Sequence, residues 1–458
     1  MSDVKPLLFG VYDQVAVGGG GAASLWTHPD DRRVGANSLE YWANVARTAD
    51  QANLDLLFFG DVLGLYDVYG ANHEAAVRWA IEAPANDPAV LVPALAALTK
   101  NVAFAITAST TYENPFSLAR RFSTIDHLSG GRFGWNIVTS YLRSAARNFG
   151  LDEMMEHDDR YERADEFMDV VYKLWEGSWA DDAVVADKAN AVFARGDRVR
   201  PIDHVGPNYR VAGPHVSSPS PQRTPLIFQA GWSPRGREFG AKHGEVIFAG
   251  ATDPAKVNEG ITDIANRAVA NGRSADAIQG ITGFSVIVGK TEIEVQEKYD
   301  KLQQNYHIEG QLVSYSGDIG VDLSNLADDE PISRDKNGFG NWIMRPDGSG
   351  KPLTMGDLRR RFEKVAARRE AAFIGTPTQI ADRIENHARI SGVRGYMLLP
   401  LLSPGTLDDF VTLVVPELIK RGLFRDKPPT GTLRSRFTAF GTDRMPSESY
   451  GAQFRFPE

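Results

Sequence analysis

Eight apolar runs of strand length recur along the chain, separated by segments with the three- and four-residue spacing of amphipathic helices. Nearly continuous apolar runs are typical of parallel strands that are buried on both faces of a sheet. The runs are LLFGVYD (7–13), LLFFGDV (56–62), VAFAITAST (102–110), FGWNIVTS (133–140), PLIFQAG (225–231), VIFAG (246–250), ITGFSVIVG (281–289) and GYMLLPLL (395–402). Eight such strands alternating with helices favour an α/β fold of the (β/α)8 TIM-barrel type, with a doubly wound open sheet as the alternative.

Two long interruptions and a distinct tail refine this outline. Residues 178–224 are rich in Asp, Pro and Gly, which predicts a local excursion from the βα rhythm. Residues 307–353 follow the seventh strand, and an interruption of that length is either a functional lid or a disordered segment. Between this segment and the last strand, Thr376-Pro377 predicts an N-cap and a helix running to about His387. We expect one barrel domain over 1–425 with two insertions, then a C-terminal extension, 426–458, that lies on the surface or reaches a partner subunit.

Composition narrows the class of protein. The net charge of −9 and a sequence pI near 5.6 argue against a nucleic-acid partner, which would need a basic surface. The chain has no cysteine, so disulfides, thiolate metal sites and a cysteine nucleophile are excluded. No apolar run approaches the length of a membrane span, and the first residues lack the pattern of a secretory leader. These features predict a cytoplasmic protein that does not bind a membrane.

Polar residues follow several of the expected strands, where a TIM barrel carries its active site. They are Asp61, Ser109–Thr111, Asn136–Tyr141, Gly231–Gly236 and Gly250. Aromatic side chains, among them Tyr66, Tyr141 and Trp232, crowd the same expected mouth. They suit a flat aromatic cofactor or an apolar substrate, although core packing explains several of them equally well.

Among these strand ends, the stretch QAGWSPRGREFG (229–240) gives the most specific indication of a ligand site. Ser233 can cap a helix that has Pro234 at its first position, and the free N–H groups of such a helix end also form a phosphate seat. Arg235 or Arg237 could add positive charge. An anion site and a plain capped turn both fit this pattern.

The segment HDDRYERADEF (157–167) is dense in ionisable residues. Tyr161, Ala164, Met168, Val171 and Trp175 are spaced by 3, 4, 3 and 4, which predicts one inward helix face. Most of the charge should then face water, and the spread of acids around the helix argues against a metal site or a carboxylate pair. Tyr161 lies on the inward face in the first turn, where it either contacts a ligand or packs as a core tyrosine. No HExxH, GxSxG or Walker motif occurs in the chain.

Several longer motifs together resemble a known family. They are DVLGLYDVYG, ANDPAVLVPALAALT, TTYENPFSLARRFSTIDHLSGGRFGWNIVTSYL, EHDDRYERADEFMDVVYKLWEGSW, SPSPQRTPLIFQAG and SPRGREF. In this order they resemble the bacterial-luciferase-like FMN-dependent monooxygenases. The similar branch contains nitrilotriacetate monooxygenase component A, dibenzothiophene-sulfone monooxygenase, long-chain alkane monooxygenase and the dimethyl-sulfide monooxygenase large subunit. The resemblance covers nearly the whole chain and thins over about 307–370.

The resemblance implies a two-component flavin monooxygenase. A separate NAD(P)H:flavin reductase would supply FMN as FMNH2, O2 would be the co-substrate, and a peroxyflavin would oxygenate a small apolar or organosulfur-type molecule. No metal is needed, and a homodimer or homotetramer is expected. The family pattern places cofactor-binding residues at Asp61, Ser109, Asn136, Val138, Thr139, Ser140, Tyr161, Ala230, Gly231 and Ser233, and residues on the reacting side of the flavin at Tyr66 and Tyr141.

The chain departs from the alkane-oxidising pattern in the expected substrate pocket. VAVGGGGAAS stands where that pattern has a cysteine and histidines, and Glu82 stands where it has a glutamine. Substrate identity therefore does not transfer. Two alternatives stay open at this point: a deazaflavin-dependent oxidoreductase of the same superfamily, and a flavin-binding protein without turnover.

Overall fold

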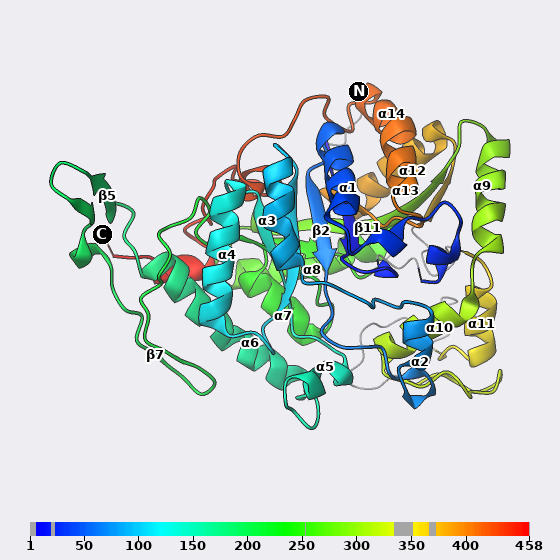
Figure 1. The fold of residues 1–458 in the computed structure, drawn as a ribbon, viewed down its shortest axis with the longest axis horizontal. Coiled ribbons are helices and arrows are strands. Elements are labelled where there is room, and N and C mark those ends of the chain that lie inside the picture. Colours follow the sequence, from blue (N-terminus) through cyan, green and yellow to red (C-terminus); the bar gives the residue numbers. More distant parts are fainter. Residues whose placement is uncertain (1–5, 20–22, 252, 334–350, 366–371, 458) are drawn as a thin grey trace.

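The eight predicted strands form a closed parallel barrel (Figure 1). The structure is a computed structural model that describes residues 6–19, 23–251, 253–333, 351–365 and 372–457. The barrel strands are β1 (Leu8–Gln14), β2 (Leu56–Gly60), β3 (Ala103–Ser109), β4 (Phe133–Val138), β9 (Leu226–Gln229), β10 (Val246–Phe248), β11 (Gln279–Val288) and β13 (Gly395–Leu398). They pair in this order, β13 pairs back to β1, and the β10–β11 pairing completes the ring. The predicted TIM barrel is confirmed, and the open-sheet alternative is wrong.

Successive side chains along each strand point alternately into the barrel and toward the surrounding helices, which gives the protein two hydrophobic cores. Inward residues such as Leu8, Phe58 and Phe228 fill the barrel, while outward residues such as Phe59 and Trp135 pack against the surrounding helices. Because both faces are buried, the strands read as continuous apolar runs rather than as an alternating pattern.

Four of the helices around the barrel begin with the same kind of cap. Asp87, Asn114, Ser233 and Asp253 each accept a backbone N–H of the first helical turn, and each is followed by proline. The helices are α1 (Leu39–Gln51), α3 (Pro88–Leu98), α4 (Pro115–Ser129), α6 (His157–Tyr172), α7 (Pro234–His243), α8 (Pro254–Ala270), α9 (Glu292–Gln304), α12 (Pro377–Ser391), α13 (Gly405–Asp409) and α14 (Val415–Lys420). The start predicted at Thr376 is confirmed, although α12 runs on past His387 to Ser391.

The two insertions carry structure of their own. Residues 178–224 contain two short hairpins, β5 (Val184–Asp187) with β6 (Val192–Ala194) and β7 (His204–Val205) with β8 (Arg210–Val211), which project from the left of the view in Figure 1. The 307–353 segment opens with α10 (Ile308–Ile319), which packs on α2 (Glu74–Arg78) and on α11 (Met355–Phe362). Part of this segment, 334–350, lies outside the described residues. A further strand that the sequence did not reveal, β12 (Ala372–Gly375), pairs with the end of β11.

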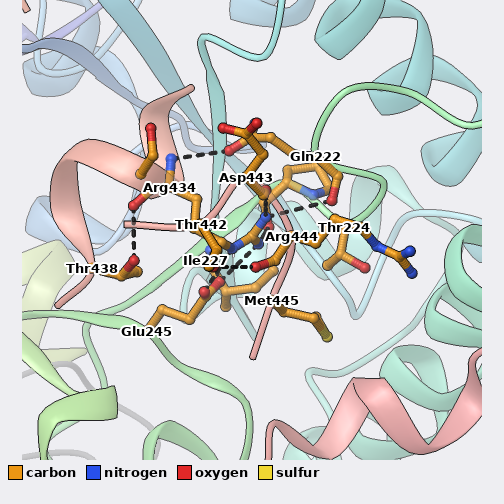
Figure 2. Close-up of polar contacts among 12 residues, drawn as sticks. Gln222, Thr224, Ile227, Glu245, Arg434, Thr438, Thr442, Asp443, Arg444 and Met445 are labelled. Atoms are coloured by element: carbon orange, nitrogen blue, oxygen red, sulfur yellow. Dashed lines mark hydrogen bonds and ion pairs between the residues drawn. The ribbon is translucent and has the colours of Figure 1, made fainter. Parts of the chain in front are cut away.

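The C-terminal tail closes the bottom of the barrel, so its predicted course along the surface is wrong for this part. The short helix α15 (Leu433–Phe437) places Leu433 and Phe437 in the same cluster as the inward strand residues. Between them, the fully buried Arg434 donates from Nε to Glu245 Oε1 at 2.8 Å and from Nη2 to Glu245 Oε2 at 2.9 Å (Figure 2). Its backbone N–H donates to Gln222 Oε1 at 3.1 Å. The tail is therefore part of the barrel core.

No helix among the described ranges is long and apolar enough to cross a membrane.

We predict that the buried pair at the barrel bottom contributes strongly to stability. Arg434→Met would leave the Glu245 carboxylate buried without its guanidinium, and losing one partner of a buried pair costs about 3–5 kcal/mol. Urea denaturation followed by circular dichroism measures this loss. Lys420→Met, which removes an exposed cation 3.5 Å from Glu417, serves as the control and should leave the midpoint unchanged. Equal midpoints for Arg434→Met and the wild type would contradict the role of the tail.

Candidate active site

Strands β3 and β4 bring paired polar side chains to the C-terminal mouth of the barrel. Thr107 pairs in register with Asn136, and Ser109 pairs with Val138. The Asn136 amide donates to Thr107 Oγ1 at 2.9 Å, while its Oδ1 atom is buried with no hydrogen-bond partner among the described residues. A buried acceptor without a donor is costly, so Asn136 fits a ligand that brings an N–H or O–H group.

A cavity of about 190 Å³ opens beside these strand ends. It is lined by four of the predicted cofactor residues, Asp61, Ser109, Val138 and Ser140. Ser140 has a left-handed backbone with φ of 59°, which is unusual for a residue with a side chain, and its hydroxyl donates to Ser109 Oγ at 2.9 Å. The structure therefore gathers this part of the predicted set around one hollow.

Among the acidic side chains that line this cavity, Asp61 has a strongly shifted pKa. Burial, and then the negative charge of Asp87, raises the pKa of its carboxyl to about 7. Asp61 therefore changes charge within the physiological pH range.

The first turn of α7 forms a second part of the site. Ser233 caps the helix by accepting the Gly236 N–H at 3.0 Å, as predicted. A side chain at Gly231 or Gly236 would lie 2.6 or 2.9 Å from the Tyr161 hydroxyl oxygen, so both positions need glycine. Ala230 leads directly from β9 into this turn. The result is a narrow cradle of backbone and hydroxyl groups at the positive end of a helix dipole.

Tyr161 joins the two parts. Its side chain is buried, and its hydroxyl lies close enough to Thr139, after β4, and to Ser233, before α7, for both to lower its pKa. Burial raises the pKa of this hydroxyl, and the nearby Arg160 and Arg235 guanidiniums oppose that shift. Tyr161 faces inward as its spacing predicted, and it faces the proposed phosphate seat rather than only the core.

The sequence predicts that most of the charge around Tyr161 faces water, and among these charged side chains only Arg160 is fully buried. Arg160 is 2% exposed and donates to the backbone carbonyl of Ser140. Asp165 accepts from Arg235, from Lys242 at 2.8 Å and from His243 at 2.8 Å. Although burial raises the pKa of Asp165, these three donors hold it well below its usual range.

Tertiary contacts, rather than helix periodicity, decide these positions. One signal was nevertheless present, because Arg160 is in phase with the buried Ala164 and Phe167. His157, another residue that the prediction left out of the site, has its Nε2 atom 3.3 Å from Ser233 Oγ.

Tyr66 and Tyr141 lie together beneath α10. Their hydroxyls hydrogen-bond to each other, and the Tyr66 hydroxyl also donates to Asp318 Oδ1 at 3.4 Å. Burial, and then the charge of Glu82, raises the pKa of both hydroxyls well above the usual value. Both tyrosines are therefore neutral hydrogen-bonding groups near neutral pH.

Helix α10 lies directly against this tyrosine pair. A side chain at Gly317 would overlap the Tyr66 ring, so glycine permits the close approach. At the other end of the helix, Glu309 Oε2 accepts from Trp79 Nε1 at 2.8 Å, and the Trp79 ring lies 4.7 Å from the His307 ring. The described part of the 307–353 segment thus packs against Tyr66 and Trp79.

Gly250 and Glu82 are two further positions that the sequence analysis singled out. Gly250, a strand-end candidate, gives room to the ring of Trp232 and so serves packing. Glu82, the departure noted in the sequence, has a left-handed backbone with φ of 49°, and its charge raises the pKa values of Tyr66, Tyr141 and Asp61.

Comparison with known proteins identifies the family of this chain. The chain is 42% identical to the long-chain alkane monooxygenase of Geobacillus thermodenitrificans (strain NG80-2), with 95% of this chain and 94% of the relative covered. It is equally similar to the dimethyl-sulfide monooxygenase of Hyphomicrobium sulfonivorans, at 42% with 95% and 91% covered. The crystal structure of a long-chain alkane monooxygenase superposes with a TM-score of 0.91 at 41% identity, covering 99% of this chain and 100% of the other.

The family assignment rests on these similarities and on one family model. A riboflavin lyase crystallised with modified FMN and riboflavin is also similar, with a TM-score of 0.90 at 36% identity and coverage of 99% and 100%. The model of the luciferase-like monooxygenases matches residues 19–395, and the resemblance seen in the sequence is confirmed. The chain therefore belongs to the luciferase-like monooxygenase family and is an enzyme of the monooxygenase class.

Proposed function

We propose that this chain is the oxygenase component of a two-component system that uses FMNH2 and O2 to oxygenate a small apolar or organosulfur-type molecule. The observation that carries the proposal is the two-part site. A hydroxyl-lined helix N-terminus suits a phosphate, and a polar cavity at the ends of β2, β3 and β4 suits a ring with N–H groups. Thr139, which acts on the Tyr161 hydroxyl, lies between the two.

The residues at α7 fit the phosphate of FMN. Ser233 and Tyr161 offer hydroxyl groups, and the first turn of the helix adds its dipole and a backbone N–H at Arg235 that has no partner within the helix. The guanidiniums of Arg160 and Arg235 lie close enough to act on the Tyr161 hydroxyl. Gly231, next to Ala230, lets an anion approach the backbone closely.

The cavity residues fit the flavin ring. Ser109 and Ser140 offer hydroxyl groups in the cavity, and Asn136, which bonds to the cavity-lining Thr107, has an Oδ1 acceptor without a donor. Asp61 can accept a hydrogen bond when ionised and donate one when protonated. This mixture of donors and acceptors matches a ring edge that carries both.

In the proposed reaction, reduced flavin supplies the electrons that activate O2, so that one oxygen atom enters the substrate. This chain would bind and orient the reactants and exclude water. Tyr66 and Tyr141 hold their protons, because burial keeps the pKa of each hydroxyl high, and they would donate hydrogen bonds on the reacting side. Helix α10 would act as the lid, since it already lies on Tyr66.

The partners and substrate follow from the relatives rather than from the site. One relative, 33% identical, is named component A of nitrilotriacetate monooxygenase, which supports a separate NAD(P)H:flavin reductase. Long-chain alkanes and dimethyl sulfide, named for the two relatives at 42% identity, support an apolar or organosulfur-type substrate. We further propose that the protein is a cytoplasmic homodimer or homotetramer.

A single turnover experiment tests the oxygenase function. The protein would be loaded anaerobically with chemically reduced FMN, mixed with ¹⁸O2, and incubated with alkanes, dialkyl sulfides and riboflavin in separate reactions. The proposal expects one ¹⁸O atom in a product of the first two classes, detected by mass spectrometry. Tight binding of FMNH2 with no oxygenated product would point to a flavin-binding protein without turnover, and turnover of riboflavin would replace the proposed substrate class.

The pKa of Asp61 predicts a pH dependence of flavin binding. The carboxyl is neutral below about pH 7 and ionised above it, where it would repel an anionic flavin phosphate or ring. The affinity of the wild type for FMNH2 should therefore fall, relative to that of Asp61→Asn, by roughly three- to tenfold between pH 6 and pH 8.5, an effect of about 1 kcal/mol.

Anaerobic fluorescence titration at a series of pH values measures the dissociation constants of the wild type and of Asp61→Asn for FMNH2. Protonation of FMNH2 itself affects both constants equally, so it cancels in their ratio. Asp152→Asn at the exposed surface is the matched control and should follow the wild type. A ratio that stays constant across this range would contradict the placement of Asp61 beside the flavin.

A further inference from the structure

Arg160 is a buried cation without a carboxylate partner. Its side chain is 2% exposed, and no carboxylate of the described residues lies within ion-pair distance of its guanidinium. Burial lowers its pKa, and the nearby Tyr161, Tyr112 and Glu156 side chains only partly oppose that shift. A guanidinium in such a place needs other acceptors, because burying a charge without hydrogen bonds is strongly unfavourable.

The acceptors that it finds are backbone carbonyls at the end of β4. Arg160 Nη1 donates to the Ser140 carbonyl and lies 3.4 Å from the Thr139 carbonyl. The Thr139 carbonyl also accepts from Thr111 Oγ1 at 2.9 Å, and the Val138 carbonyl accepts from the Thr110 N–H at 3.0 Å. Three consecutive carbonyls are thus held from outside the strand.

This segment needs such support because its backbone is unfavourable. Ser140 has a φ of 59°, which a residue with a side chain adopts only where its surroundings impose it. In that conformation its hydroxyl reaches Ser109, and both Ser140 and Val138 line the cavity. The same segment presents Thr139 to the Tyr161 hydroxyl.

We propose that Arg160 is a positioning residue that fixes the Thr139–Ser140 backbone and thereby shapes the cavity for the flavin ring. This inference rests on the proposed function, since it assumes that a flavin occupies the cavity. The inference connects Arg160 with binding of the flavin ring, whereas the adjacent Tyr161 faces the proposed phosphate site at the first turn of α7. A role limited to phosphate charge is the competing account, because Arg160 also acts on the Tyr161 hydroxyl.

Binding of two reduced flavins separates these accounts. FMNH2 carries the phosphate and reduced riboflavin lacks it, so a ring effect changes both affinities and a phosphate effect changes only one. Anaerobic titrations would compare the wild type with Arg160→Met and with Arg160→Lys, which keeps the charge but loses the planar fork of donors. Tyr161→Phe would report a phosphate effect. Arg163→Met, one turn along α6, where the side chain lies over the Tyr209 ring, is the matched control.

The positioning role predicts that Arg160→Met weakens both flavins by the same factor, about tenfold or more, and that Arg160→Lys also weakens both. Tyr161→Phe should weaken FMNH2 alone, and Arg163→Met should change neither. Full FMNH2 affinity in Arg160→Lys, or unchanged riboflavin affinity in Arg160→Met, would overturn the inference in favour of a charge role. A lowered melting temperature with unchanged affinities would overturn it in favour of a purely structural role. Failure of the wild type to bind either flavin would contradict the proposed function itself.

Discussion

The closure of the barrel between β10 and β11 is the constraint on which the rest of the structure depends. In a closed ring of parallel strands, all C-terminal ends meet at one mouth, so residues far apart in the sequence become neighbours. Ser109, Asn136 and Gly231 lie in this way on or just after three neighbouring strands, β3, β4 and β9. The opposite end is filled by the C-terminal tail, where Arg434 bonds to Glu245 inside the core. One end of the barrel is thus devoted to stability, and the other is left free to carry polar groups.

At the mouth, charge and hydrogen bonding divide the site into regions with different chemistry. The start of α7 and the Tyr161 hydroxyl favour an anion, whereas the cavity beside β3 and β4 offers a mixture of donors and acceptors. Beneath α10, the protonated Tyr66 and Tyr141 meet the carboxylates of Asp318 and Glu82. The first turn of α6 connects the first two regions, because its adjacent residues Arg160 and Tyr161 hold the end of β4 and the start of α7.

Much of the architecture could be predicted from the sequence because it depends on local patterns. The eight strands are continuous apolar runs, and the cap at Ser233 follows from a polar residue before proline. The inward position of Tyr161 follows from helical spacing. These features need no knowledge of the rest of the fold.

The features that the sequence did not reveal depend on tertiary contacts. Arg160 and Arg434 are charged residues that are buried because distant carbonyls and a carboxylate receive them. Helix α15 is five residues long and has no periodicity to recognise, although it plugs the barrel. Gly317 in α10 leaves room for the Tyr66 ring, a contact that no local sequence pattern indicates. Because the proposed site combines such contacts, local sequence patterns do not reveal its specificity.

A crystal structure of the protein with bound FMN tests the central claim most directly. The account predicts that the phosphate lies within hydrogen-bond distance of the Tyr161 and Ser233 hydroxyls, and that the ring lies against Ser109, Asn136 and Ser140. A phosphate bound away from the first turn of α7, or a ring outside the cavity lined by Asp61 and Ser140, would contradict it.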